Sequence, residues 1–233
     1  MSRYTSQYTG SEIDEAIGRA LPNGVIDTAL AEKAPAGYGL GGGAKFITSG
    51  SLNDYKNCGW YAWDENVNNT PFPYGSCIIL NKGSSWIVHQ IAIAGYGQSI
   101  CIRKYFNQTD EWDAWEYINP PMQPGVEYRT TERYQGKPVY VKLIDFGALP
   151  NKTIKKVDPN ITNFSKLVDM RIIIAMSDGS YHIENIWSDN GTNAISLSRA
   201  WFKLSTGGIA IYTFSDQSAN SAIVTIKYTK TTD

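Results

Sequence analysis

The sequence predicts a mainly β protein, with a short N-terminal helical segment, a compact β domain and a C-terminal antiparallel β-sandwich. Three observations lead to this prediction. The chain is rich in glycine and low in charge, with 18% charged and 12% aromatic residues, which suits short strands joined by turns. Alternating apolar and polar residues recur between turn signals across residues 45–233. Helical periodicity is limited to residues 9–34.

Residues 1–34 are predicted to be a helical segment for oligomerisation or attachment. Thr9 or Ser11 can cap the helix, with Glu12 or Asp14 three residues further on. The apolar residues that then share one face are Ile13, Ala16, Ile17, Ala20 and Leu21. This face packs either on its own domain or against copies of itself. We favour the second interpretation because the sequence offers no other helix nearby.

The helix is expected to end at residues 22–24, Pro-Asn-Gly, with a shorter helical stretch over 25–33. Residues 35–44 are rich in glycine and predict a flexible linker. Residues 45–118 predict the compact β domain. Its expected strands are residues 59–63, 76–80, 85–94 and 98–106, followed by a short last strand at 112–117, with a loop at 64–75.

Residues 119–125 are rich in proline and predict a stiffer linker, and residues 126–233 predict the antiparallel sandwich. The run 125–150 indicates two alternating strands joined by a Gln-Gly-Lys-Pro turn at 135–138. The Ser-Asp-Gly sequence at 177–179 is typical of a hairpin turn. The expected strands are residues 137–146, 168–176, 181–187, 194–204, 208–214 and 221–229.

The composition argues against several classes of protein. The net charge is −1, and the absence of a basic surplus argues against nucleic-acid binding. The apolar runs are too short for a membrane span and no signal-peptide pattern occurs, so we expect a soluble protein made without export. Cys58, Cys77 and Cys101 are too widely spaced for a disulfide framework or a zinc motif. They are expected to be buried strand thiols, with one incidental disulfide as the alternative.

Several motifs resemble parts of phage tail proteins. Residues 51–61 (Ser-Leu-Asn-Asp-Tyr-Lys-Asn-Cys-Gly-Trp-Tyr), an apolar hairpin and residues 111–117 (Glu-Trp-Asp-Ala-Trp-Glu-Tyr) resemble the pyocin-knob module of phage and pyocin tail fibres. Residues 33–40 are similar to a linker phrase of the same proteins. The segments that look like the C-terminal head domain of tail-fibre and baseplate proteins are residues 136–140, 145–150 and 224–230. The order of these motifs is more specific than any one of them.

The resemblance implies a homotrimeric receptor-binding protein at the tip of a tail fibre or baseplate, carried on a virion and assembled in the host cytoplasm. It implies attachment to a bacterial surface polysaccharide and contact with other tail or baseplate proteins, without membrane insertion. No enzymatic activity, cofactor or metal ion is expected. Two alternatives stay open: a glycan depolymerase on the same scaffold, and a structural spacer whose receptor is bound elsewhere in the particle.

The sequence offers little for catalysis. It has no nucleophile elbow, no zinc-protease motif and no Walker-type phosphate loop. Asp110, Glu111 and Asp113 cluster around a tryptophan, and paired carboxylates can serve glycoside hydrolysis. The resemblance favours a structural role for that tryptophan and so disfavours this interpretation. His89 and His182 lie in separate alternating strands and are expected to be structural.

Sugar binding requires an exposed aromatic face and nearby polar groups. The best candidate is Trp187 with the polar loop after it. The predicted binding residues are Trp187, Asp189, Asn190, Asn193, Trp201 and Tyr212. The alternative is that Trp187 and Trp201 belong to the sandwich core and that the loops are ordinary turns. A second candidate is the loop at residues 66–74.

Overall fold

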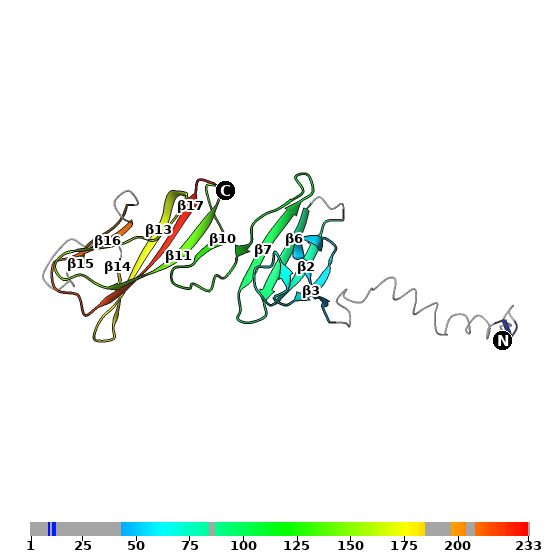
Figure 1. Cartoon of the computed structure of the whole chain (residues 1–233), viewed down its shortest axis with the longest axis horizontal. Helices are drawn as coiled ribbons and strands as arrows, with labels where there is room; N and C mark the ends of the chain where they lie inside the picture. The colour runs from blue at the N-terminus through cyan, green and yellow to red at the C-terminus, as the bar shows by residue number, and fades with distance from the viewer. Residues whose placement is uncertain are drawn as a thin grey trace, which may run out of the picture. The chain divides into compact units, whose positions relative to one another are not determined.

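In the computed structural model the chain is mainly β, as predicted (Figure 1). The structure describes residues 9, 11–12, 43–83, 87–184, 197–203 and 208–232, with the backbone alone at 184, 197–199 and 201–203. The chain divides into two compact units. The first comprises the residues up to 98 together with 103–113, and the second comprises 99–102 together with 114–233. Strand β7 (Ile100–Phe106) is therefore divided between the units.

Near the N-terminus the structure describes the cap of the predicted helix. The Thr9 N–H donates to Glu12 Oε2 at 2.7 Å, and the Glu12 N–H donates to the Thr9 hydroxyl at 3.3 Å. This reciprocal pair is the capping box that the sequence allowed at Thr9. The hydrogen bonds from Thr9 lower the pKa of Glu12 below its ordinary value. The apolar face of the predicted helix, which begins at Ile13, lies outside the described residues.

The sheet of the first unit is mixed. β1 runs parallel to β3, while β3, β5 and β6 are antiparallel neighbours. These strands are β1 (Lys45–Ile47), β3 (Gly59–Trp63), β5 (Gly75–Asn81) and β6 (Ile87–Ala94). A short parallel pair, β2 (Gly50–Ser51) and β4 (Val67–Asn68), lies outside the main order, and a 3-10 turn covers Leu52–Asp54. The strands predicted at 59–63, 76–80, 85–94 and 98–106 are confirmed as β3, β5, β6 and β7, and β1, β2 and β4 are additional.

A buried polar network crosses the inner face of this sheet. In β6 the alternation is confirmed, but the buried side carries Val88, Gln90 and Ala92, and the neighbouring isoleucines face outward. Gln90 Nε2 donates to the carbonyl oxygens of Leu52 and Tyr55, each at 3.0 Å. These bonds satisfy a fully buried amide, which would otherwise destabilise the fold.

Arg103 completes this network. Its Nε donates to Gln90 Oε1 at 2.9 Å, and its guanidinium lies over the Trp112 ring at 4.3 Å. Burial lowers the pKa of Arg103 to about 10. The Trp112 Nε1–H donates to the carbonyl oxygen of Asn53 at 3.3 Å. Residues of both knob-like motifs therefore meet in one structural cluster.

The second unit contains two sheets. In the larger one β9 runs parallel to β10, and the order β10-β11-β17-β13-β14 is antiparallel throughout. Its strands are β9 (Glu116–Tyr117), β10 (Glu127–Tyr134), β11 (Lys137–Ala148), β13 (Phe164–Ala175), β14 (Tyr181–Glu184) and β17 (Ser221–Lys230). The smaller sheet is antiparallel and consists of β12 (Ile154–Val157), β16 (Gly208–Thr213) and β15 (Leu197–Lys203).

Both sheets contribute to one hydrophobic core. The larger sheet supplies inward residues such as Tyr140, Ile172 and Val224, and the smaller sheet supplies Ile209 and Ile211. Strand β17 lies between β11 and β13, with its residues paired on both sides (Figure 1). Its register against β13 and β11 therefore fixes which side chains of the larger sheet face the core.

Two predicted turns are confirmed in place. Gln135 and Gly136 have positive φ values of 51° and 80°, so they form a two-residue hairpin loop between β10 and β11. Lys137 and Pro138, which the prediction included in the turn, belong to β11. The turn at residues 177–179 joins β13 to β14.

The expected last strand of the first β domain, residues 112–117, is wrong as a single strand. The Asp113 N–H still continues the pairing of β8 (Glu111–Trp112) with β7, through a bond to the Lys104 carbonyl oxygen at 2.8 Å. One extra residue between Asp113 and Glu116 then shifts the register, so the strand is interrupted before β9 begins. β9 then pairs with Cys101 and Ile102 on one side and with Thr130 on the other. Strand β12 is a further addition to the prediction.

We expect Gly208→Ala to destabilise the second unit. Gly208 has a φ of 84°, and a Cβ there would lie 2.4 Å from Pro159 Cδ and 2.7 Å from the Val157 carbonyl oxygen. Gly179 has a similar φ of 86° with open space around it, so Gly179→Ala is the matched control. Both variants introduce left-handed strain, and the crowding should cost Gly208→Ala about 1–3 kcal/mol more in urea unfolding. Equal losses in the two variants would contradict the close packing of β16 on residues 157–159.

Candidate functional site

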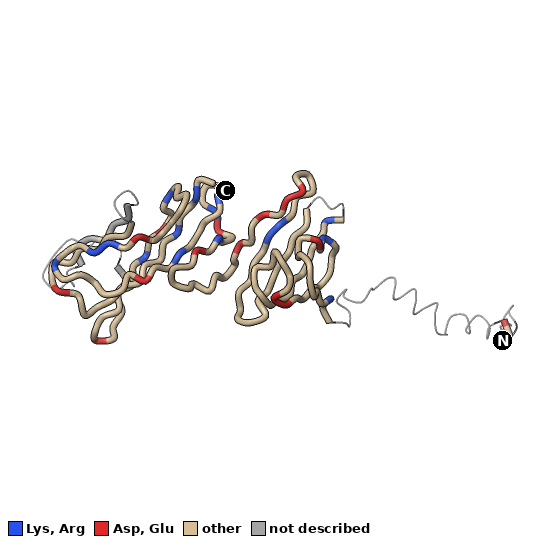
Figure 2. Tube along the Cα trace, viewed as in Figure 1, with Lys and Arg blue, Asp and Glu red and all other residues tan. Residues whose placement is uncertain are grey.

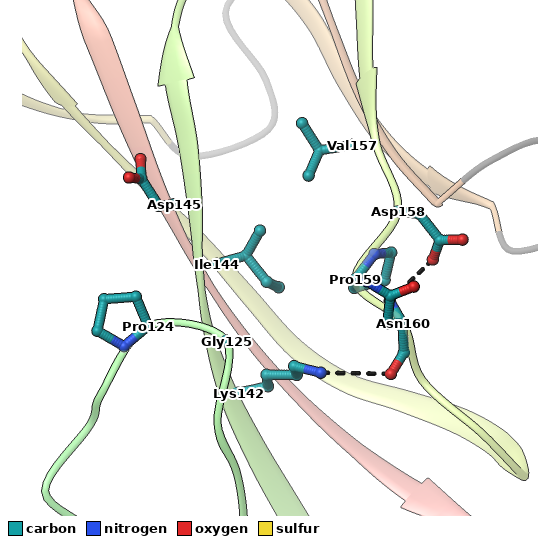
Figure 3. A pocket seen from close by; sticks show the side chains of 9 residues that line it. All are labelled: Pro124, Gly125, Lys142, Ile144, Asp145, Val157, Asp158, Pro159 and Asn160. Atoms are coloured by element: carbon teal, nitrogen blue, oxygen red, sulfur yellow. Dashed lines mark hydrogen bonds between the residues drawn. The ribbon is translucent and has the colours of Figure 1, made fainter.

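A cavity of about 380 Å³ opens in the second unit beside strand β11 (Figure 3). One wall consists of Lys142, Ile144 and Asp145 from β11. The other walls are residues 124–125, just before β10, and residues 157–160, at the end of β12 and after it. The volume lies within the range of about 300–1,000 Å³ that is typical of ligand pockets.

Lys142 occupies a position on the core side of its strand. Alternation in β11 points Tyr140, Ile144 and Phe146 into the hydrophobic core, and Lys142 lies between the first two on the same face. The residue is 8% exposed. Its ammonium donates to the carbonyl oxygen of Asn160 at 3.3 Å (Figure 3). Among the described residues, no carboxylate forms an ion pair with it.

Two exposed carboxylates stand at the rim of the cavity, each held by a backbone amide. Asp158 Oδ1 accepts from the Asn160 N–H at 2.8 Å, and Asp145 Oδ1 accepts from the Gly147 N–H at 2.9 Å. A β-bulge between Asp145 and Gly147 interrupts the pairing with β17 at this point. Because bulges redirect side chains, the bulge explains how Asp145 reaches the cavity beside its neighbour Ile144.

A second feature of this unit is an aromatic surface on the smaller sheet. Tyr212 and Phe214 lie two residues apart, with ring centroids 5.0 Å apart in an edge-to-face arrangement. Phe214 is 60% exposed and Tyr212 is half-buried. Ile154, the cross-strand partner of Tyr212, is also exposed. We call these three residues the aromatic surface.

The predicted binding residues are only partly described. Trp187, Asp189, Asn190 and Asn193 lie outside the described residues, so their prediction stands untested. Trp201 is in β15, where its backbone pairs with Ala210, two residues from Tyr212. Tyr212 thus remains as the one predicted residue whose side chain is described, and Phe214 and Ile154 join it.

The second candidate loop, residues 66–74, has a defined arrangement. The Trp63 Nε1–H donates to the carbonyl oxygen of Phe72 at 3.0 Å, and Asn69 Nδ2 donates to the Ser51 hydroxyl at 2.9 Å. At the end of the loop, Tyr74 meets Tyr96 edge to face at 5.3 Å. Polar groups of the loop are therefore used to hold its own shape.

The acidic residues at 110 and 113 interact with different partners and do not form one site. Asp110 accepts a hydrogen bond from the Tyr105 hydroxyl at 2.6 Å and lies 3.5 Å from the Lys56 ammonium. Asp113 lies 3.6 Å from the Lys104 ammonium. The hydrogen bond from Tyr105, followed by the charge of Lys56, holds the pKa of Asp110 below its ordinary value. A glycosidase general acid needs the opposite shift.

The cysteines and histidines lie in separate strands or loops. Cys77 and Cys101 are buried strand thiols as predicted, and burial raises the pKa of each to about 12. Cys58 departs from the prediction: it is half-buried and lies before β3, where its Sγ accepts from the Asn81 N–H at 3.2 Å. All three thiols are free, so the alternative disulfide is not formed. His89 and His182 are half-buried in β6 and β14.

The charges of the described chain are interspersed along both units (Figure 2). Within that part of the chain, no group of three His, Cys, Asp or Glu residues is arranged to hold a metal ion. No helix among the described residues has the length and apolar character that crossing a membrane requires.

Comparisons with known proteins identified no related protein. A scan against models of protein families found no match, and neither did searches among curated proteins and solved structures. The resemblance to phage tail proteins therefore rests on the sequence motifs alone.

Sequence reasoning missed Lys142 and Phe214. A signal for Lys142 is present, since it interrupts the otherwise apolar run from Val139 to Ile144. Phe214 follows Tyr212 at the spacing that places two strand residues on one face, although it lies one residue beyond the end of β16.

We expect Tyr105→Phe to raise the pKa of Asp110 toward that of an ordinary aspartate, because the strongest hydrogen bond to its charged form is lost. A carboxyl-detected NMR titration between about pH 2 and pH 6 measures this change. Asp178, whose pKa is lowered by Ser180, is the internal control and should not change. A pKa of Asp110 above the ordinary value in the unmodified protein would instead support the hydrolase alternative.

Proposed function

We propose that this protein is a non-enzymatic receptor-binding protein of a phage tail or phage-tail-like particle, and that it attaches to a bacterial surface glycan. The order of the knob-like and head-like motifs supports this proposal. In it, the first unit corresponds to the knob, and the two sheets of the second unit correspond to the sandwich head. The protein would reside at the fibre or baseplate tip, beside other tail proteins.

The aromatic surface is the observation that carries the binding role. An exposed aromatic ring stacks on the apolar face of a pyranose, which is the main apolar contact that sugars offer. Phe214 is exposed, and the edge-to-face contact with Tyr212 holds its ring in place. The predicted Trp187 loop lies between β14 and β15 in sequence.

We expect the full chain to bind polysaccharide from susceptible bacteria, and Phe214→Ala to weaken that binding about tenfold, through loss of a stacking contact worth about 1.4 kcal/mol. Biolayer interferometry on immobilised polysaccharide measures the affinity. Tyr181→Ala is the matched control, since Tyr181 is an exposed aromatic residue of the same unit on the larger sheet.

The same experiment separates the alternatives. Absence of binding to every host glycan would favour a structural spacer. Release of new reducing ends during the incubation would favour a depolymerase. Equal loss of binding in the Phe214 and Tyr181 variants would place the binding surface elsewhere than on the smaller sheet.

We propose also that the protein is a homotrimer. The predicted helical seam is joined to β1 by the short linker at 35–44, so copies held at the seam keep their first units at high effective concentration. The outer face of the first unit is apolar: Trp60, Leu80 and Ile93 are each about half exposed. Trp60 pairs with Ile78, which pairs with Ile91. Exposed apolar faces of this kind are typical of surfaces that a partner covers.

We expect light scattering coupled to size-exclusion chromatography to give the mass of three copies. The double variant Leu80→Lys, Ile93→Lys should raise the concentration at which the oligomer dissociates by at least about tenfold, because two ammonium groups would be buried at the interface. Ile223→Lys, on a similarly exposed position of the second unit, is the control. A monomeric unmodified protein at micromolar concentration would contradict the trimer.

A further inference from the structure

We propose that the cavity beside β11 is a subsite for a sugar residue that carries one carboxylate, such as a hexuronate unit, with Lys142 as the group that recognises the charge. This inference rests on the proposed glycan-binding function and specifies the class of glycan. It concerns a surface different from the aromatic surface, and nothing in the sequence motifs points to it.

The position of the Lys142 ammonium indicates that it binds an anion. An ammonium is rarely placed among core residues without an anionic partner, because its removal from water is costly. Lys142 lies on the core side of β11, and the hydrogen-bond acceptor that it reaches among the described residues is the neutral carbonyl oxygen of Asn160. An ammonium has three donors, so two remain for a ligand in the cavity. A ligand carboxylate would supply the missing charge.

The charged residues around Lys142 limit the charge that a ligand can carry. Asp145 and Asp158 both line the cavity. Both carboxylates are exposed, so solvent screens them more than it screens the buried ammonium of Lys142. Their negative charges oppose an anion with two or more charges, such as a phosphate monoester, and they limit the negative charge of a ligand to the group that contacts Lys142.

The two carboxylates of the cavity can accept hydrogen bonds from the hydroxyl groups of a ligand. Each carboxylate uses Oδ1 for a backbone amide, that of Asn160 or Gly147, and its Oδ2 remains able to accept from a ligand hydroxyl. Carboxylate oxygens are strong acceptors for sugar hydroxyls. A ligand with a carboxylate at one end and hydroxyls at the other satisfies both parts of the site, which describes a uronic acid residue.

Part of the cavity wall is apolar and is held in place by a backbone hydrogen bond. Pro124, Ile144 and Pro159 offer C–H surface for the apolar face of a sugar ring (Figure 3). The Gly125 N–H donates to the Leu143 carbonyl oxygen at 2.7 Å, which fixes the segment before β10 against β11. The walls are thus held before a ligand arrives, and less conformational entropy is lost on binding.

The test compares two oligosaccharides of equal length, one with glucuronate units and one with glucose units, by isothermal titration calorimetry on the full chain. We expect at least about tenfold tighter binding of the glucuronate form, and a weaker preference as salt is raised. Lys142→Met should abolish the preference. Lys166→Met, which removes an exposed lysine of the same unit, should preserve it. Equal affinities, or a preference that survives in Lys142→Met, would overturn the proposal.

A second measurement does not depend on the folding of a variant. Free glucuronate is titrated into the unmodified protein and the backbone amides are followed by NMR. We expect shifts at Gly125, Gly147 and Asn160, which line or border the cavity, with none at Phe214. Shifts elsewhere, or none, would overturn the subsite. Tight binding of neutral glycans with no effect of Lys142→Met would reject the subsite and leave the proposed function standing, whereas failure to bind any glycan would reject the proposed function.

Discussion

The two-residue repeat of strand β11 is the constraint on which the second unit depends. Its neighbours on both sides, β10 and β17, hold it in a fixed register, so each side chain is committed to one face. Tyr140, Ile144 and Phe146 must face inward to close the core. Lys142 lies two residues from both Tyr140 and Ile144 in the same strand, so it also faces inward. The inward position of Lys142 beside the cavity follows from this register, and the bulge that redirects Asp145 is the place where the register against β17 shifts.

The first unit differs from the second because the buried face of its sheet carries polar side chains. Gln90 and Arg103 are buried, and the hydrogen bonds of Gln90 to backbone carbonyls and to Arg103 replace the contacts of its amide with water. Leu52, Asn53 and Trp112, from the motifs on which the knob resemblance depends, are part of this arrangement. These motif residues therefore belong to the framework of the first unit, and a binding function has to be sought on exposed surfaces.

The sequence was sufficient for the strands that alternate between clear turn signals. β3, β10, β11, β16 and β17 were recognised in this way; the bounds of β3 were correct, and β11, β16 and β17 each end within two residues of the prediction. Short strands such as β2 and β12 were not, because a few residues carry too little periodicity and their pairing is with distant segments. The same limitation explains the division of residues 111–117 into β8 and β9, which depends on a one-residue shift in their pairing with β7.

The candidate site was less predictable than the fold. Alternation shows that a strand has two faces, and it does not show which face the rest of the chain will cover, so Lys142 was not recognised as a residue of the buried face. In the same way, Gln90 proved to be on the buried side of β6, while the isoleucines beside it face outward. Tyr212 was recognised, and its two-residue spacing could have indicated Phe214, but Ile154 can be placed beside Tyr212 only once the pairing of β12 with β16 is known.

The place of β17 in the middle of the larger sheet has a consequence for biosynthesis. Strands β11 and β13 are translated well before residues 221–230, yet neither pairs with the other. Until the ribosome has released residues 221–230, the nascent chain exposes two long unpaired edges, which are prone to associate with other chains. Folding of this unit is expected to be slow, since its closing contacts join residues far apart in sequence.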